Sequence, residues 1–416
     1  MRLVIYILFF FSALTLFSQS DIENQKLNDA VQQIEGDLNK AKVRVDNLCS
    51  NPQTSQKASS WYLKGYVYTE FAKSQVFSTK YPGADEIALS AIKKSLELDK
   101  TKQFYSDILN EMMDLTITVY NKAIQNYNQA VNAKNNDKFS TAIHYFELYF
   151  DCYQTLGVDK KFIDDFIKYN KVSLKSINFY YAYATQTVGQ KEKAMAMYKK
   201  IIDLNDDPAT AKAKGMPLAY LYYSKLLEEQ KDTEKAVAII KRGVKLFPQK
   251  TELIINATSL FNKYKKTDDL VDLLESQDID KITDLKILFV LGQNYRRLSR
   301  EYKKNGYQST ADQYKNKALK IYQKAIAMNP KDQKDLFKLY YNISVIYFNQ
   351  GVDIYKTNYE NRKGFQAEFN KALEYLVKAH QIDKTDRHIM NMMMKAYQMT
   401  DQNEKAKVID SEMYGG

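Results

Sequence analysis

The chain has 416 residues, of which only 13 are glycine and 6 are proline. Together with abundant Lys, Glu, Leu and Ala and almost no strand signals, this composition excludes a β-rich fold and favours helices joined by short turns. The formal net charge of +11 favours acidic partners or anionic surfaces, with lysines that merely solvate helix faces as the alternative.

The N-terminal segment has the layout of a secretory signal. Arg2 precedes an uncharged apolar run over residues 3–17, and small residues at Ser18 and Ser20 suit cleavage after Ser20. The run is shorter than the roughly 20 residues that span a bilayer. We therefore expect residues 1–20 to be a signal peptide and the mature chain to be exported to the periplasm or cell surface, with an uncleaved anchor as the alternative. Cleavage removes one positive charge, Arg2, and leaves +10.

The next segment, residues 21–57, contains an amphipathic helix. Its apolar residues recur at steps of three and four, at Leu27, Val31, Ile34, Leu38, Ala41, Val45 and Leu48. Such a helix either packs on the following repeat as a cap or pairs with another helix as a coiled coil, whose seam would be only about three heptads long. We expect the cap, followed by a linker up to residue 57.

A two-helix pattern recurs along most of the mature chain. Its second helix has a small residue at i, a large one at i+4 and, in most copies, a small one at i+7, all on one stripe of an α-helix. The clearest copy is Ala236, Ile240 and Gly243, which ends at Phe247-Pro248 because proline cannot continue the helix. Further copies begin at Ala88, Ala194, Ala318 and Ala372.

A partner helix with a matching face precedes each copy. One example is Leu288, Leu291-Gly292 and Tyr295. The two helices together resemble the tetratricopeptide repeat, from about Ala58 to Asp410. The resemblance implies an all-α, right-handed superhelical solenoid of about eight helix pairs over residues 58–410, with a frayed tail at 411–416. The Lys-, Asn- and Tyr-rich composition and the end of the apolar run also resemble exported proteins of the Bacteroidota.

Three of the units depart from the family pattern because the link between their two helices is longer. These links are residues 71–87, 299–317 and 349–371, and parts of them can continue as longer helices. Insertions in solenoids map to one face and often serve binding, and harmless extension is the alternative. The basic run from Arg296 to Lys304 reaches into the second link and suits a polyanion or a solvated helix face.

The resemblance also implies where a partner binds. In this family the first helices line a concave groove, and the matching positions here are Tyr62, Tyr66, Tyr127, Phe179, Tyr183, Lys225, Phe289, Gln293 and Tyr341, with Leu221, Ile255 and Asn391 at further groove-facing positions. Aromatic rings offer a large contact area at low entropy cost. Packing of the same rings between helices is the alternative.

The sequence contains no pattern typical of an enzyme. The chain has only three histidines, His144, His380 and His388, and none has a metal-ligand partner at the usual spacing. There is no Gly-rich phosphate loop and no nucleophile elbow. Cys49 and Cys152 either form a disulfide or are small buried hydrophobes. We expect no catalysis, no cofactor and no metal.

These observations predict a scaffold that binds a protein or peptide in the concave groove, for envelope assembly or secretion. The alternative is a module that binds an anionic glycan or lipid of the envelope. Nucleic acid is not expected, since an exported protein rarely meets it. End-to-end self-assembly through the methionine-rich C-terminal unit is a further alternative.

Overall fold

The computed structural model describes residues 38–157, 174–203 and 216–414, together with Asp159, Ile163 and Phe166. Within these ranges the chain forms eighteen α-helices and one short 3-10 helix, and no strand. The expectation of an all-α fold is therefore confirmed. The proposed signal peptide, the beginning of the segment 21–57 and the last two residues of the tail lie outside the described residues.

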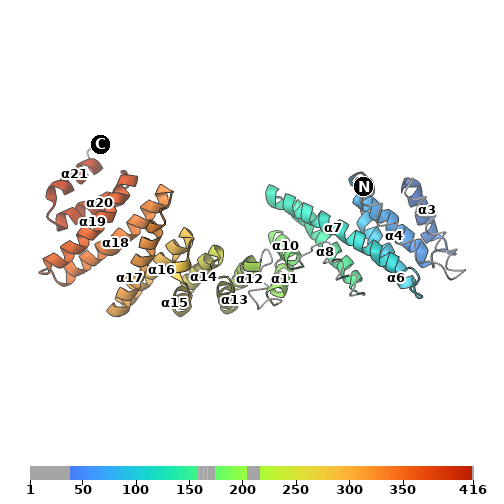
Figure 1. The fold of residues 1–416 in the computed structure, drawn as a ribbon, viewed down its shortest axis with the longest axis horizontal. Helices are drawn as coiled ribbons and strands as arrows, with labels where there is room; N and C mark the ends of the chain where they lie inside the picture. The colour runs from blue at the N-terminus through green and yellow to red at the C-terminus, as the bar shows by residue number, and fades with distance from the viewer. Residues whose placement is uncertain are drawn as a thin grey trace. The chain divides into compact units, whose positions relative to one another are not determined.

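The chain divides into two compact units (Figure 1). The first contains helices α3 to α11. The second contains Pro217 and all later residues, so it includes α12 except for the first residue of that helix. The helices of the first unit are α3 (Leu38–Ser50), α4 (Ala58–Lys73), α5 (Gln75–Lys80), α6 (Ala84–Leu98), α7 (Tyr105–Ala133), α8 (Asn136–Leu156), α10 (Leu174–Thr187) and α11 (Lys191–Asp203).

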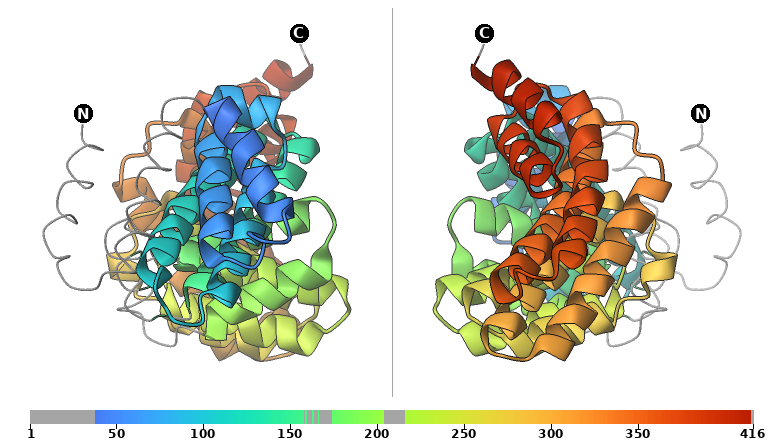
Figure 2. Two further views of the ribbon diagram at one scale, coloured as in Figure 1. Left: turned by 90° about the vertical axis from the view of Figure 1, so that its right-hand side faces the viewer. Right: turned by 90° about the vertical axis from the view of Figure 1, so that its left-hand side faces the viewer.

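The second unit continues with α12 (Met216–Glu229), α13 (Thr233–Leu246), α14 (Thr251–Lys263), α15 (Thr267–Glu275), the 3-10 helix η1 (Ile279–Lys281), α16 (Leu285–Lys304), α17 (Gln308–Ala327), α18 (Gln333–Thr357), α19 (Arg362–Ile382), α20 (Arg387–Met399) and α21 (Asn403–Tyr414). In the right-hand view of Figure 2 the helices α18 to α21 of this unit are drawn in orange and red.

Successive helices pack as pairs, as the repeat pattern predicts. The described pairs are α4 with α6, α7 with α8 and α10 with α11 in the first unit, and α12 with α13, α14 with α15, α16 with α17, α18 with α19 and α20 with α21 in the second. The three pairs of the first unit and the five pairs of the second agree together with the expected number of about eight. Each unit is thus an α-solenoid in which a helix pair contacts its neighbours in the sequence.

The stripe of small and large residues explains why the helices of a pair approach closely. A Cβ atom built on Gly292 of α16 would lie 2.5 Å from Cε1 of Tyr322 on α17, and one built on Gly65 of α4 would lie 2.6 Å from Cγ1 of Ile92 on α6. Glycine at these positions lets the partner's large side chain sit directly against the helix backbone. The stripe alanines Ala88, Ala194, Ala236, Ala318 and Ala372 are all fully buried.

The lengthened units take two forms. The link at 71–87 contains the separate short helix α5, whereas residues 299–317 and 349–371 mostly extend the paired helices themselves. As a result α16 and α17 have 20 residues each, and α18 and α19 have 25 and 21. The pair of α7 and α8 is also long, with 29 and 21 residues, although no lengthened link is expected in this unit.

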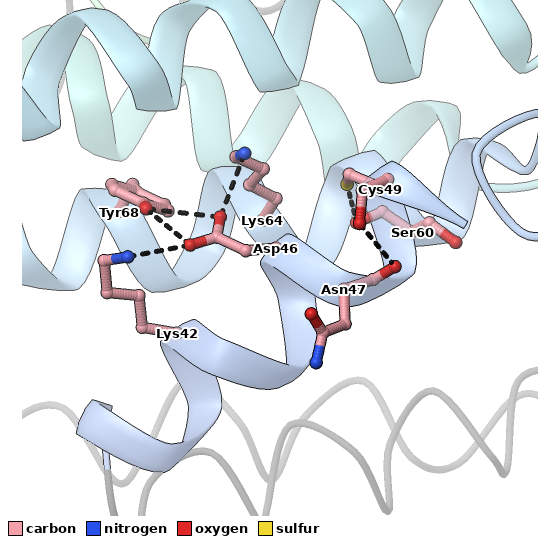
Figure 3. Close-up of polar contacts among 8 residues, drawn as sticks. Lys42, Asp46, Asn47, Cys49, Ser60, Lys64 and Tyr68 are labelled. Atoms are coloured by element: carbon pink, nitrogen blue, oxygen red, sulfur yellow. Dashed lines mark hydrogen bonds and ion pairs between the residues drawn. The ribbon is translucent and has the colours of Figure 1, made fainter.

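Helix α3 packs on α4, next to the first helix pair. Ala41, Val45 and Cys49 form its buried face. Beside them Asp46 accepts hydrogen bonds from Lys42 at 2.8 Å and from the hydroxyl of Tyr68 at 3.1 Å, as Figure 3 shows. The same carboxylate pairs with Lys64 at 3.0 Å.

The charge of Asp46 stabilises this contact between α3 and α4. Burial disfavours its ionisation, but the hydrogen bonds from Lys42 and Lys64 outweigh that cost and lower the pKa of Asp46. The described part of the amphipathic helix therefore contacts the first pair through both an apolar face and a polar cluster.

Both cysteines are free thiols in the core of the first unit. The Cys49 thiol donates to the carbonyl of Ser60 at 3.4 Å, and burial raises its pKa to about 11. Cys152 is fully buried on α8, which raises its pKa further. Of the two alternatives, small buried hydrophobes describe these residues, and neither is an activated nucleophile.

Candidate functional site

In the first unit, two of the expected groove residues lie where α4 faces α7. Tyr62 and Tyr66 are half-buried on α4. Burial above all, and then the carboxylate of Glu111 on α7, raises the pKa of Tyr62. This tyrosine is therefore a neutral hydrogen-bonding group that lies near α7, the first helix of the next pair.

Tyr127 and Phe179 are core residues, contrary to the expectation that they face an open groove. They are 8% and 6% exposed. The ring of Tyr127 on α7 lies 4.8 Å from that of Tyr180 on α10, and 6.3 Å from that of Tyr183. The rings are buried because the two helices are rich in aromatic residues and these pack on one another. Tyr183 remains half-exposed at the edge of the cluster.

In the second unit, Phe289 lies in a cleft between successive first helices. The cleft has a volume of about 270 Å³. It is lined by Ile255 of α14, by Leu285, Lys286, Phe289 and Val290 of α16, and by Asp335, Lys338 and Leu339 of α18. We call it the inner cleft. Its lining is mainly apolar, with two lysines and one aspartate among the side chains.

A buried ring packs beside the apolar lining of the inner cleft. The ring of Phe289 lies 6.4 Å from that of Tyr322, which is fully buried on α17. Ile255 is 36% exposed, which is high for an isoleucine. An aromatic ring beside an exposed aliphatic side chain offers an apolar contact for a ligand.

The other expected groove residues of the second unit lie outside the inner cleft. Lys225 is exposed on α12 and borders a smaller hollow of about 60 Å³, together with Asn256. Gln293 is exposed on α16. Tyr341 is half-buried on α18, with its ring 5.8 Å from that of His388 on α20.

The groove positions expected from the sequence do not include the charged residues of the inner cleft. Lys286 and Lys338 stand three residues before Phe289 and Tyr341, which is one turn earlier on the same helix faces. Extending each groove position by one helical turn would have found both lysines.

No group of histidine, cysteine, aspartate and glutamate able to hold a metal ion occurs in the described part of the chain. His144 contacts Glu86 at 2.9 Å and His380 contacts Glu412 at 3.2 Å, each as a single pair. None of the described helices has the length and apolar character needed to cross a membrane.

The paired helices and their small-and-large stripe define an α-solenoid of tetratricopeptide-like units. No protein-family model and no curated protein matches the sequence. Among solved structures, the chain is similar to YrrB, described as a TPR protein with an unusual peptide-binding site, at 15% identity and a TM-score of 0.33, over 52% of this chain and 89% of that one.

Two further structures are similar at the same level. A TPR repeats protein from Bacteroides fragilis has 15% identity and a TM-score of 0.29, over 67% of this chain and 98% of that one. Human IFIT1, solved as a dimer with PPP-AAAA, has 14% identity and a TM-score of 0.31, over 89% of this chain and 70% of that one. Likeness at this level transfers no ligand or binding residue to this chain.

Proposed function

We propose that the protein is a non-enzymatic scaffold that binds an extended segment of a partner protein in the inner cleft. The observation that carries this proposal is the apolar lining formed by Phe289 and Ile255 on successive first helices. Clefts with a mainly apolar lining and a few polar groups are the usual form of binding sites in proteins. Repeat proteins bind through extended surfaces of this kind.

The chemistry of the inner cleft favours a peptide with alternating apolar and charged side chains. An apolar side chain of the peptide would contact Phe289, while Lys286 and Lys338 would attract acidic side chains and Asp335 a basic one. The exposed amide of Gln293, one turn further along α16, can pair with a peptide backbone.

A peptide selected on the protein from a displayed random library tests this proposal. Replacing Phe289 with alanine, or Ile255 with serine, is expected to weaken binding of that peptide by at least about tenfold, because the central apolar anchor is removed. Isothermal titration calorimetry measures the affinity. Tyr307→Ala is the matched control, since this residue is 62% exposed in the same unit and lies outside the inner cleft.

Two results would count against the inner cleft as the binding site. One is a library that yields no specific peptide. The other is a peptide whose affinity is the same for the protein, for Phe289→Ala and for Ile255→Ser. Circular dichroism of each variant shows whether a loss of binding reflects loss of the fold.

We further propose that the scaffold acts outside the cytoplasm, in assembly of the cell envelope or in secretion. The support is the N-terminal sequence, with one basic residue, an uncharged apolar run and small residues before Asp21. Mass spectrometry of the protein from envelope and medium fractions is expected to find Asp21 as its first residue. Recovery of the chain from the cytosol with residues 1–20 intact would contradict export.

A further inference from the structure

The extended ends of α16, α17 and α18 enclose a second cleft in the second unit, which we call the arginine cleft. Its volume is about 340 Å³. Arg296 and Arg300 of α16 line it, opposite Lys315 of α17 and Asn349 and Gln350 of α18. Arg300 follows Phe289 by eleven residues, which is about 16 Å along a helix, so the arginine cleft is separate from the inner cleft.

Arg296 has hydrogen-bonding capacity that the described residues leave unused. Its Nε and Nη1 atoms are buried and have no hydrogen-bond partner, and the same is true of the hydroxyl of Tyr322. Burial raises the pKa of Tyr322 and the charge of Arg296 lowers it, so the guanidinium lies near the hydroxyl. Because these two atoms are buried, a ligand in the cleft meets only the rest of the Arg296 guanidinium, whose charge has no counterion among the described residues.

The acidic groups of the arginine cleft are already paired with other cations. Asp353 forms an ion pair with Lys303, and Asp312 forms one with Lys315 at 2.7 Å. The neighbouring Arg297 pairs with Glu301 at 3.2 Å and does not line the cleft.

Two guanidinium groups on successive turns of α16 therefore remain uncompensated. Arg300 is exposed, and no ion pair joins it to the described residues. Together with Arg296 it presents two positive charges on one face of the helix, since residues four apart are neighbours there.

We propose that the arginine cleft binds the phosphoryl group of a small organic phosphate monoester. The two charges of such a group match the two uncompensated guanidinium groups, whose planar forks suit phosphate oxygens. The cleft is larger than a bare phosphate, and Ala311, Ile346 and Ile354 line it as an apolar contact for the organic part. This proposal does not depend on peptide binding in the inner cleft.

Calorimetric titration of the full mature chain with glycerol 3-phosphate at low ionic strength tests the proposal. Saturable one-to-one binding is expected, together with competition by inorganic phosphate. Arg300→Gln is expected to weaken binding at least about tenfold, because one of the two forks is lost. Because the Arg300 side chain is exposed, Arg300→Gln is not expected to unfold the protein. Arg296→Gln removes a partly buried group, so circular dichroism must show that this variant still folds.

Lys304→Gln is the matched control. It removes the same charge from an exposed position on the same helix, outside the cleft lining, and is expected to change the affinity less than twofold. An equal loss in Lys304→Gln and Arg300→Gln would show that overall positive charge attracts the anion, and would overturn the proposal. Absence of saturable binding would overturn it as well.

Two further probes distinguish the sources of the anion. Succinate, a dicarboxylate, is expected to bind at least about tenfold more weakly than glycerol 3-phosphate, and equal binding would overturn the phosphoryl assignment. Vesicles that contain phosphatidic acid test a lipid headgroup. If the protein binds such vesicles but no soluble monoester competes, the binding is adsorption to a charged surface. That result would overturn the assignment of the phosphoryl group to the arginine cleft.

Discussion

Tyr322→Ala is expected to lower the free energy of unfolding by about 3–5 kcal/mol, the range for truncating a large aromatic side chain in a packed core. Tyr322 is fully buried on α17. Its ring lies against the backbone of Gly292 on α16 and beside the ring of Phe289. Removal of the ring leaves a cavity between the two helices of the pair, which their extended backbones cannot easily close.

Gly292→Ala tests the same contact from the other side. The added Cβ would lie 2.5 Å from Cε1 of the Tyr322 ring, so the ring or the helix must move, at a cost of about 1–3 kcal/mol. In a chain that already carries Tyr322→Ala this cost disappears, and alanine is expected to stabilise helix α16 by up to about 1 kcal/mol relative to glycine. The two substitutions are therefore strongly coupled.

Urea unfolding of the single and double variants, followed by far-ultraviolet circular dichroism, measures both effects. Hydrogen exchange then shows whether α16 and α17 lose protection first, as expected when neighbouring pairs stabilise one another. Tyr307→Ala removes an exposed ring from the same unit and is the control. Additive effects of Gly292→Ala and Tyr322→Ala would contradict the proposed contact.

Glu111→Gln is expected to stabilise the protein by up to about 3 kcal/mol at pH 8 and to have little effect near pH 4.5. Glu111 is 6% exposed on α7, and its Oε1 has no hydrogen-bond partner. Burial raises its pKa to about 7, although the nearby charge of Lys73 opposes the shift. Lys73 itself pairs with Glu70 at 2.7 Å and with Asp114 at 2.8 Å.

The direction of the pH dependence follows from the raised pKa. In the unfolded chain this carboxyl ionises near its usual value of 4.5, whereas the folded protein holds the proton up to about pH 7. Between these values the folded state binds more protons than the unfolded state, so stability falls as the pH rises through this window. Above about pH 7 the buried carboxylate of Glu111 lowers the free energy of unfolding by its full amount, and the uncharged glutamine removes that loss.

Thermal unfolding of the protein and the variant at pH 4.5, 6 and 8 measures this prediction. The difference in midpoint between them is expected to grow with pH. Glu192→Gln changes an exposed carboxyl on α11 of the same unit and is expected to show no such trend. A constant difference at all three pH values would mean that Glu111 ionises normally in the folded protein.

The repeat architecture could be predicted from local sequence patterns. Positions such as Ala236, Ile240 and Gly243 lie at helical spacing, and each pair of helices buries its stripe against neighbours in the sequence. Because the packing of a solenoid is local, periodicity predicts that the residues of this stripe form the core. The buried alanines and the close approach at Gly292 agree with that prediction.

The binding surface could be predicted only in part. Phe289 and Tyr127 occupy equivalent positions in the repeat, yet Phe289 lines a cleft and Tyr127 is buried. The difference depends on the next first helix. Tyr180 and Tyr183 cover Tyr127, whereas α18 leaves open space beside Phe289.

The sequence by itself therefore determined the helix pairs and the small-and-large stripe, and it named the basic run from Arg296 to Lys304. Only the tertiary structure decided which aromatic rings are covered and which of those basic side chains remain unpaired. The physical reason is that helical periodicity assigns each side chain to a face of its own helix, while exposure and ion pairing depend on the side chains of the neighbouring helices.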